Sequence, residues 1–190
     1  MALGRRTRGW TSHGRRVQPG MDPVARLGAP APGFELPDIN GKVHRLPDRP
    51  GRIVVLNFWS VECPWSAHAD PQVMAAVQGS TTDLWTIACC SGESLEVIRR
   101  VAQERGLKTV LLDPNQAVAD LYQASATPHI FLIDTDGVLR YRGAPDDTGF
   151  GSRPATRSYL EQALTALKAG RWPDPAETPA LGCAIVRRLG

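Results

Sequence analysis

The chain has 190 residues, of which 42% are hydrophobic, and a formal net charge of +3. This length and apolar content fit one ordinary folded domain and exclude a chain that is disordered throughout. Residues 1–20 hold five arginines and no acidic residue, so the remainder has 17 basic and 19 acidic residues and a net charge of −2. We therefore expect no nucleic-acid partner. No segment approaches 18 consecutive apolar residues, so we also expect no membrane span.

The expected domain boundaries follow changes in composition. Residues 1–26 are interpreted as a flexible basic tail, 27–170 as one domain, and 171–190 as an extended, proline-containing tail that carries Cys183. The arginine-rich start has no apolar run and is not typical of a secretory signal. It is either a basic tail or the product of a mis-called start codon upstream of Met21.

Hydrophobic patterning predicts strands that alternate with helices. Asn40-Gly41 is a hairpin signal between two short strands, and residues 53–59 are rich in β-branched and aromatic side chains, as in a strand buried on both faces. Gly106 marks the end of a helix that begins at Ser91 or Ser94. The predicted strands are 34–38, 42–46, 53–59, 84–89, 109–112, 129–133 and 138–142. The other predicted helices are about 65–78, 115–123 and 156–168.

This order of elements predicts an α/β fold with three layers. Alternating strands and helices favour a parallel core with right-handed crossovers, and the last two strands add an antiparallel edge hairpin. The mixed sheet would be central and flanked by helices, with a separate β-hairpin near the amino-terminal end. Chemistry in such a sheet lies at the carboxyl ends of its central strands, where strand 53–59 leads to Cys63.

Cys63 is the candidate nucleophile. Pro64 suits the first turn of a helix, so Cys63 would lie next to unpaired backbone N–H groups and the positive end of the helix dipole. Such surroundings lower the pKa of a thiol and make it nucleophilic at neutral pH. The alternative is a buried cysteine that only packs at the end of a strand.

The other cysteines are Cys89, Cys90 and Cys183, and four cysteines are too few for a disulfide scaffold in a chain of this length. A reducing compartment in which one or two thiols react fits this number better, so we expect a cytoplasmic protein. No set of His, Cys, Asp or Glu residues has the spacing of a structural zinc site. We expect no metal and no cofactor.

Residues 57–66 resemble the active-site segment of thioredoxin-fold proteins. Pro71 matches the proline that kinks the thioredoxin helix, and Thr127-Pro128 matches the Thr-Pro element, normally cis, that faces the reactive cysteine. Residues 31–42 resemble the amino-terminal hairpin of redoxins of the alkyl hydroperoxide reductase/thiol-specific antioxidant type. The resemblance covers about residues 28–170 and implies a thioredoxin-like fold with a redox-active cysteine.

Departures from these families limit what the resemblance implies. Ser66 replaces the second cysteine of the Cys-x-x-Cys motif, so no disulfide can form within the motif. Peroxiredoxins carry Ser or Thr three residues before their peroxidatic cysteine, which Ser60 matches. Their proline seven residues before it is Leu56 here, and the arginine of their pocket falls at Pro128. Without that arginine we expect at most weak peroxidase activity.

The carboxyl-terminal end resembles a one-cysteine, peroxiredoxin-like group that ends in Gly-Cys-x-Ile-Lys-Trp. Gly182, Cys183 and Ile185 match this ending, whereas Val186-Arg187 replaces its last two residues. A cysteine on an extended tail could reach Cys63 and resolve a sulfenic acid or a mixed disulfide. The alternative is a packed tail cysteine without a redox role.

Five further residues are weaker candidates. Cys89 and Cys90 end a strand near the same edge of the sheet; core packing is the favoured interpretation, and a backup resolving role is the alternative. His129 and His68 are candidate catalytic bases, with packed or surface histidines as the alternative. Trp65 is interpreted as an exposed recognition surface or as a packed aromatic lid.

We therefore expect a thiol-dependent oxidoreductase in which Cys63 attacks a disulfide or an oxidised thiol. Its partners would be a protein or small-molecule disulfide, held by the backbone of Thr127-Pro128, and an external thiol reductant. The alternatives are a weak peroxidase that reduces hydroperoxides through a Cys63 sulfenic acid and a non-catalytic binding module. The candidate catalytic residues are Cys63 and, as a resolving thiol, Cys183. The candidate cleft residues are Ser60, Pro64, Trp65, Ser66, Thr127 and Pro128.

Overall fold

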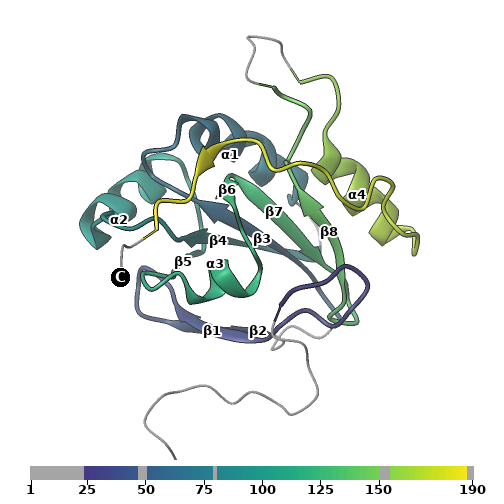
Figure 1. The fold of residues 1–190 in the computed structure, drawn as a ribbon, viewed down its shortest axis with the longest axis horizontal. Helices are drawn as coiled ribbons and strands as arrows, with labels where there is room; N and C mark the ends of the chain where they lie inside the picture. The colour runs from purple at the N-terminus through teal and green to yellow at the C-terminus, as the bar shows by residue number, and fades with distance from the viewer. Residues whose placement is uncertain (1–23, 47–50, 79–80, 150–154, 188–190) are drawn as a thin grey trace, which may run out of the picture.

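A five-stranded mixed sheet forms the centre of the protein (Figure 1). The computed structural model describes residues 24–46, 51–78, 81–149 and 155–187, so the arginines of residues 1–20 lie outside the described part. The strands are β1 (Phe34–Pro37), β2 (Val43–Leu46), β3 (Ile53–Trp59), β4 (Thr82–Ala88), β5 (Val110–Leu112), β6 (Ala126–Thr127), β7 (His129–Ile133), β8 (Leu139–Gly143) and β9 (Cys183–Ala184). The helices are α1 (Pro64–Ala76), α2 (Leu95–Glu104), α3 (Ala117–Leu121) and α4 (Tyr159–Lys168).

The sheet has the strand order β5-β4-β3-β7-β8, with β3 at its centre. β3 and β4 are parallel, as are β4 and β5, whereas β7 runs antiparallel to both β3 and β8. All seven residues of β3 are buried, as expected for a strand covered on both faces. The predicted α/β fold, with a parallel core, an antiparallel edge and the β1–β2 hairpin, is confirmed.

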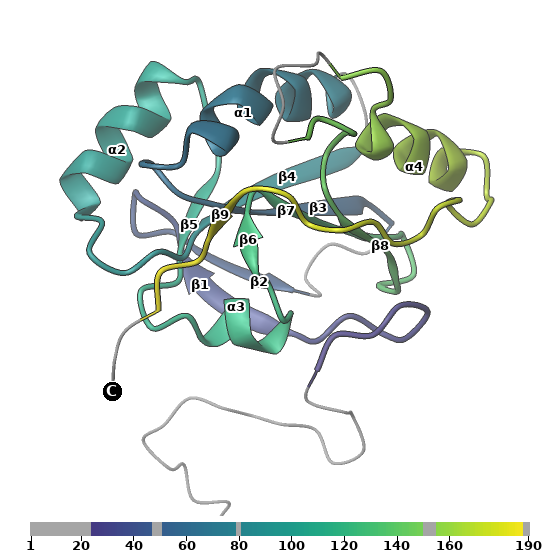
Figure 2. The same cartoon turned by 45° about the horizontal axis from the view of Figure 1, so that its top comes forward.

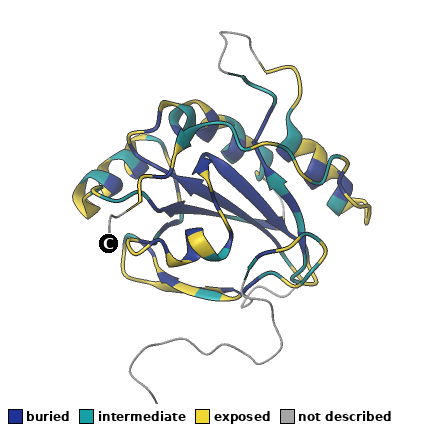
Figure 3. Cartoon of the chain, in the orientation of Figure 1, coloured by how far each residue is buried: buried dark blue, intermediate teal, exposed yellow. Residues whose placement is uncertain are grey.

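Alternate residues of β3 face opposite layers of the fold. Val55 packs in the cluster formed with α1 and α4, and Leu56 packs in the cluster formed with α3 and the β1–β2 hairpin. Helices α1, α2 and α4 therefore cover one face of the sheet, and α3 and the hairpin cover the other (Figures 1 and 2). The strands of the central sheet are mostly buried, whereas the outer surfaces of the helices are exposed (Figure 3). Burial of this apolar surface fixes β3 and the loop that follows it.

Helix α1 begins directly after Cys63, which is its N-cap residue. Pro64 occupies the first helical position, where a missing N–H costs no hydrogen bond. Pro71 lies inside the helix, as the resemblance predicted. The sequence therefore predicted both the start of this helix and the position of Cys63 at it.

The carboxyl-terminal tail packs as part of the domain. Its strand β9 lies beside β6 and pairs with it in antiparallel register, with Thr127 opposite Cys183 (Figure 2). Ile185 is only 7% exposed and belongs to the same core cluster as Leu56. The sequence predicted an extended tail but not that the tail contributes a strand and a core residue. Near the other end of the described chain, Ala25 is 1% exposed, so packing begins before residue 27.

Within the described ranges, no helix has both the length and the apolar character needed to cross a membrane.

Candidate active site

The fold brings Cys63 and Cys183 together at the amino-terminal end of α1. The Sγ atom of Cys63 lies 2.7 Å from that of Cys183 and 2.9 Å from the carbonyl oxygen of Thr127. Both cysteines are free thiols. Their separation exceeds the length of an S–S bond, about 2.05 Å, by only about 0.7 Å. The two residues are 120 positions apart in the sequence, so tertiary structure alone creates this pair.

The two thiols of this pair differ in acidity. Burial raises the pKa of Cys63, but hydrogen bonds from the Cys183 thiol and from the backbone N–H of Ser66 outweigh burial and lower the pKa overall. Burial raises the pKa of Cys183 to about 11, and its hydrogen bond to Cys63 adds to this increase. Cys63 is therefore the more acidic thiol of the pair, and the one that more readily ionises to the nucleophilic thiolate.

The backbone of Thr127 holds the tail beside Cys63. The Thr127-Pro128 peptide bond is cis, as the resemblance predicted. Gly182 approaches Thr127 so closely that a Cβ atom there would lie 2.1 Å from the Thr127 carbonyl oxygen, so only glycine fits. The tail of the same chain thus occupies the backbone edge that we expected to hold a partner peptide.

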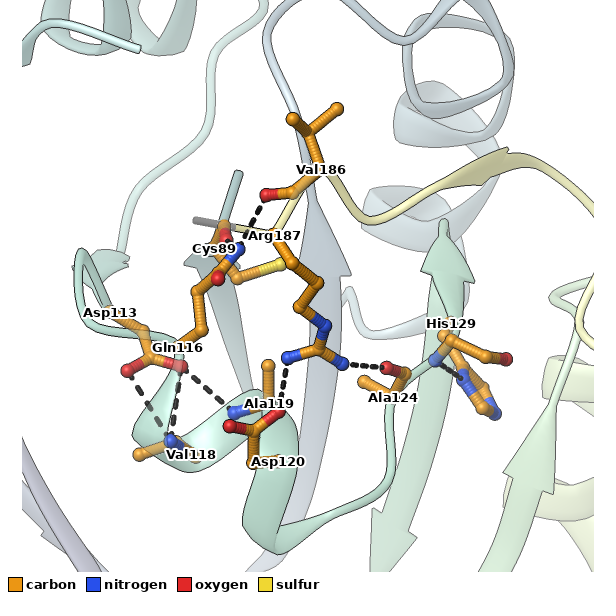
Figure 4. A network of polar contacts seen from close by, with 11 residues as sticks. Cys89, Asp113, Gln116, Val118, Ala119, Asp120, Ala124, His129, Val186 and Arg187 are labelled. Carbon is orange, nitrogen blue, oxygen red and sulfur yellow. Dashed lines mark hydrogen bonds and ion pairs between the residues drawn. The ribbon is translucent and has the colours of Figure 1, made fainter. Parts of the chain in front are cut away.

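Side chains from the α3 region anchor the end of the tail (Figure 4). Gln116 Nε2 donates to the carbonyl oxygen of Val186 at 2.6 Å. Arg187 pairs with the Asp120 carboxylate and donates to the carbonyl oxygen of Ala124. Because Val186 and Arg187 follow β9 closely, these contacts restrict the movement of β9 away from the reactive pair.

Ser60 lies in the loop before Cys63 but faces Glu93. Its hydroxyl donates to Glu93 Oε1 at 2.5 Å, and the backbone N–H of Val61 donates to the same oxygen at 3.0 Å. Burial raises the pKa of Glu93 more than these hydrogen bonds lower it. Ser60 also contacts Cys90, and no described hydrogen bond joins it to Cys63. The sequence predicted Ser60 as a cleft residue but did not predict Glu93.

A buried ion pair beneath α1 supports the same loop. Asp70 is 2% exposed, accepts a hydrogen bond from Trp59 Nε1 at 3.1 Å and pairs with Arg105 at 3.1 Å. Arg105 also donates to the carbonyl oxygen of Val61 at 3.1 Å. Burial raises the pKa of Asp70, although both partners oppose this change. Sequence reasoning missed this pair; its signal was an acidic residue among apolar positions of the helix.

The remaining predicted cleft residues lie on the first turns of α1. Ser66 is fully buried, and its hydroxyl has no hydrogen-bond partner among the described residues. Pro64 is exposed, and Trp65 is half-buried. Trp65 and His68 line a shallow depression together with Pro128. This depression provides a contact surface next to the cis proline.

His129 is only 7% exposed and stacks on Phe131, with ring centroids 4.5 Å apart. Its ring accepts a hydrogen bond from the backbone N–H of Ser125 at 3.4 Å. Burial lowers the pKa of His129 to about 4, and the charge of Arg142 contributes. No described contact joins His129 to Cys63, so this geometry favours a packing role over that of a base.

The candidate reactive groups of this site are the sulfur atoms of Cys63 and Cys183. In the part of the chain that the structure describes, no group of three or more His, Cys, Asp or Glu residues could hold a metal ion. A thiolate with a second thiol at 2.7 Å can instead exchange disulfide bonds. The site consists of the cysteine pair, the N-terminus of α1 and the backbone edge at the cis proline.

Residues 27–142 match the model of the AhpC/TSA family. The chain belongs to this family. The segment that matches the AhpC/TSA model contains Cys63 and Thr127-Pro128 but ends before Cys183. The tail cysteine thus lies outside the part of the chain that the family model describes.

Curated relatives of the chain are named thiol-disulfide oxidoreductases. The thiol-disulfide oxidoreductase ResA of Bacillus subtilis is 32% identical over 112 residues, which are 58% of this chain and 63% of that protein. The protein of the same name from Geobacillus thermodenitrificans is 30% identical over 118 residues, or 60% and 67% of the two chains. The chain thus spans about two thirds of the length of these relatives.

The structure of an uncharacterized conserved protein from Geobacillus kaustophilus has a TM-score of 0.80 at 29% identity, covering 87% of this chain and 94% of that chain. Together with the family match and the relatives, this similarity identifies a thiol-dependent oxidoreductase of the thioredoxin fold, as the sequence predicted.

Proposed function

We propose that the protein is a thiol-disulfide oxidoreductase in which Cys63 attacks the substrate and Cys183 resolves the intermediate. The observation that carries the proposal is the 2.7 Å separation of their Sγ atoms. The lowered pKa of Cys63 and the raised pKa of Cys183 support this division of roles, because the thiolate is the attacking form. The names of the curated relatives support disulfides as the substrate class.

The proposed reaction has two exchange steps. The Cys63 thiolate attacks one sulfur of a substrate disulfide, binds that half as a mixed disulfide and expels the other half as a thiolate. Cys183 gives its proton to the expelled thiolate or to water and then attacks Cys63 Sγ. This step releases the second half as a thiolate and leaves a Cys63–Cys183 disulfide. An external thiol reductant returns the pair to two thiols by the same chemistry.

Access to Cys63 determines which disulfides can react. Cys63 is only 2% exposed, and β9 occupies the backbone edge of Thr127 next to it. An extended peptide would need that same edge and would have to displace β9. We therefore expect small disulfides to react without complete displacement of the tail, and protein disulfides to react more slowly.

The test is a stoichiometric reaction with 2-hydroxyethyl disulfide, followed by acid quenching, alkylation and peptide mapping. We expect the wild type to yield a Cys63–Cys183 disulfide and the Cys183→Ser variant to stop at a mixed disulfide on Cys63. The Cys63→Ser variant is the matched control and should yield neither product. A wild-type protein that keeps a stable adduct on Cys63 without the bridge would contradict the role of Cys183.

Hydroperoxide reduction is the second candidate, because Cys183 could also resolve a Cys63 sulfenic acid. No described hydrogen bond to Cys63 comes from a basic side chain. The described site therefore lacks a positive charge that would stabilise the oxygen leaving when the O–O bond of a hydroperoxide breaks. We expect slow peroxide consumption and fast disulfide exchange; the reverse order would favour the peroxidase.

A binding module would form no Cys63–Cys183 bridge with either the disulfide or the hydroperoxide. A reducing compartment such as the cytoplasm would keep the pair as thiols.

A further inference from the structure

A second thiol faces a cavity between the end of β4 and the start of α2. The cavity has a volume of about 250 Å³, and its wall includes Cys90, Glu93, Leu95, Ile98 and Leu112. Sites for drug-sized ligands have volumes of about 300–1,000 Å³, so this cavity can hold only a smaller molecule. Its wall combines apolar side chains with one thiol and one carboxyl group.

Hydrogen bonds to Cys90 favour its reactive form. The Cys89 thiol and the backbone N–H of Val186 lie within hydrogen-bonding reach of the Cys90 sulfur, and the Ser60 hydroxyl, whose proton is donated to Glu93, also contacts it. These contacts lower the pKa of Cys90 to about 6, against burial and the charge of Glu93, which raise it. Cys90 is therefore mainly a thiolate at neutral pH, and the thiolate is the nucleophile.

Cys89 cannot readily remove an adduct from Cys90. It is fully buried, and its hydrogen bond to Cys90, together with burial, raises its pKa well above the ordinary value. Consecutive Cα atoms are about 3.8 Å apart, which is shorter than the about 4.4–6.8 Å usual across a disulfide. A mixed disulfide on Cys90 would therefore persist and would not convert to a disulfide between the two neighbours.

Glu93 gives the cavity a preference for cationic over anionic ligands. Among the described residues that line the cavity there is no Lys or Arg, and Glu93 is the one carboxylic acid. Its Oε1 atom accepts hydrogen bonds from Ser60 and Val61, whereas its second carboxyl oxygen has no hydrogen-bond partner among the described residues. The ionised carboxylate would attract a cationic ligand and repel an anionic one.

We infer that Cys90 is a second thiol site, which forms a mixed disulfide with small aliphatic disulfides that carry cationic or neutral arms. The Cys90 thiolate attacks one sulfur of the disulfide, whose S–S bond breaks. One arm remains bonded to Cys90 in the cavity, and the other leaves as a thiolate. This reaction goes beyond the exchange proposed at Cys63, because it requires neither Cys63 nor Cys183.

The test uses the full chain with Cys63→Ser and Cys183→Ser, in which only Cys89 and Cys90 can react. Three reagents with arms of two carbons are compared at pH 8: cationic cystamine, neutral 2-hydroxyethyl disulfide and anionic 3,3′-dithiodipropionate. Each rate is divided by the rate of the same reagent with free 2-mercaptoethanol, and peptide mapping locates the adduct. We expect adducts on Cys90 alone, with cystamine about tenfold faster than dithiodipropionate.

Two further substitutions in this chain separate the effect of the Glu93 charge on the rate from the effect of the space available in the cavity. Glu93→Gln should leave Cys90 reactive and remove most of the difference between the three reagents. Leu95→Trp, at a position that is 38% exposed, should slow all three reagents by similar factors because the larger side chain fills the cavity. Adducts on Cys89, equal normalised rates for the three reagents, or an unchanged preference in the Glu93→Gln chain would overturn the inference.

Discussion

The two thiol pairs of this protein differ in how their sulfur atoms are brought together. Cys63 and Cys183 are 120 positions apart and meet because β9 pairs with β6. Cys89 and Cys90 are neighbours in the sequence and need no tertiary structure to be close. The distant pair is nevertheless the one whose geometry permits a disulfide, because consecutive residues are too close for an unstrained S–S bond.

Both pairs share one electrostatic feature. In each pair one thiol donates a hydrogen bond to its partner and lowers the partner's pKa, at Cys63 in the first pair and at Cys90 in the second. Their surroundings then differ, since Cys63 faces a second sulfur that can attack, and Cys90 faces a cavity. A lowered pKa makes a thiol reactive, but the position of the next sulfur decides whether its adduct is released.

Replacing Cys63 should have the largest effect on disulfide reduction. Cys63→Ser should lower turnover of a small disulfide in the presence of an external thiol on the order of 10³-fold, because the serine hydroxyl is not ionised at neutral pH. Cys90→Ser should lower turnover much less. Thermal unfolding of both variants at nearly the wild-type midpoint would show that the losses are chemical. Equal losses would remove the functional distinction between the pairs.

The first pair also shows how far the sequence predicts the site. Residues 53–59 and Pro64 have local patterns that predict a buried strand and a helix start, so the position of Cys63 followed from the sequence. The pairing of β9 with β6 involves two residues on each side, too few for a recognisable strand pattern. The resemblance of the tail suggested a role for Cys183, but only the folded structure shows the tail against Thr127.

The polar contacts around the loop were less predictable. Glu93 lies in a loop, and Asp70 lies within a helix; each acquires its partner from a distant segment. Their burial results from how α1 and α2 pack on the sheet; the apolar neighbours of Asp70 in its helix were a sequence signal, whereas Glu93 in its loop had none. Ile185, an apolar residue in a proline-containing tail, was the available signal that the tail packs against the core.

Gly182→Ala should separate the two sulfurs of the first pair without altering either cysteine. The added Cβ would lie 2.1 Å from the Thr127 carbonyl oxygen, so β9 must move away from β6. We expect formation of the Cys63–Cys183 disulfide to slow about 10- to 100-fold in quenched-flow peptide mapping. Gly149→Ala is the matched control, since nothing lies within 4 Å of the added atom. Similar rates in the two variants would mean that β9 does not position Cys183.

Cys183→Ala should change the acidity of Cys63 and leave that of Cys90 nearly unchanged. Loss of the thiol that donates to Cys63 should raise the pKa of Cys63, whereas Cys90 should keep a pKa of about 6. Because only the thiolate reacts, alkylation of Cys63 by iodoacetamide should slow a few-fold at pH 7 and remain unchanged well above its pKa. The measurement is a pH profile for each cysteine by mass mapping. An unchanged Cys63 profile would assign its acidity to the helix N–H groups alone.

Arg187→Ala should give the smallest change, because it weakens the anchor of the tail and leaves the β6–β9 pairing intact. An exposed ion pair such as that of Arg187 with Asp120 contributes about 0.2–1 kcal/mol, and the hydrogen bond to the Ala124 carbonyl adds a similar amount. We expect disulfide formation between Cys63 and Cys183 to slow about two- to fivefold, with the effect decreasing at high salt. Arg171→Ala, on an exposed part of the same tail, is the control. An effect as large as that of Gly182→Ala would show that the end of the tail, and not β9, holds Cys183 at Cys63.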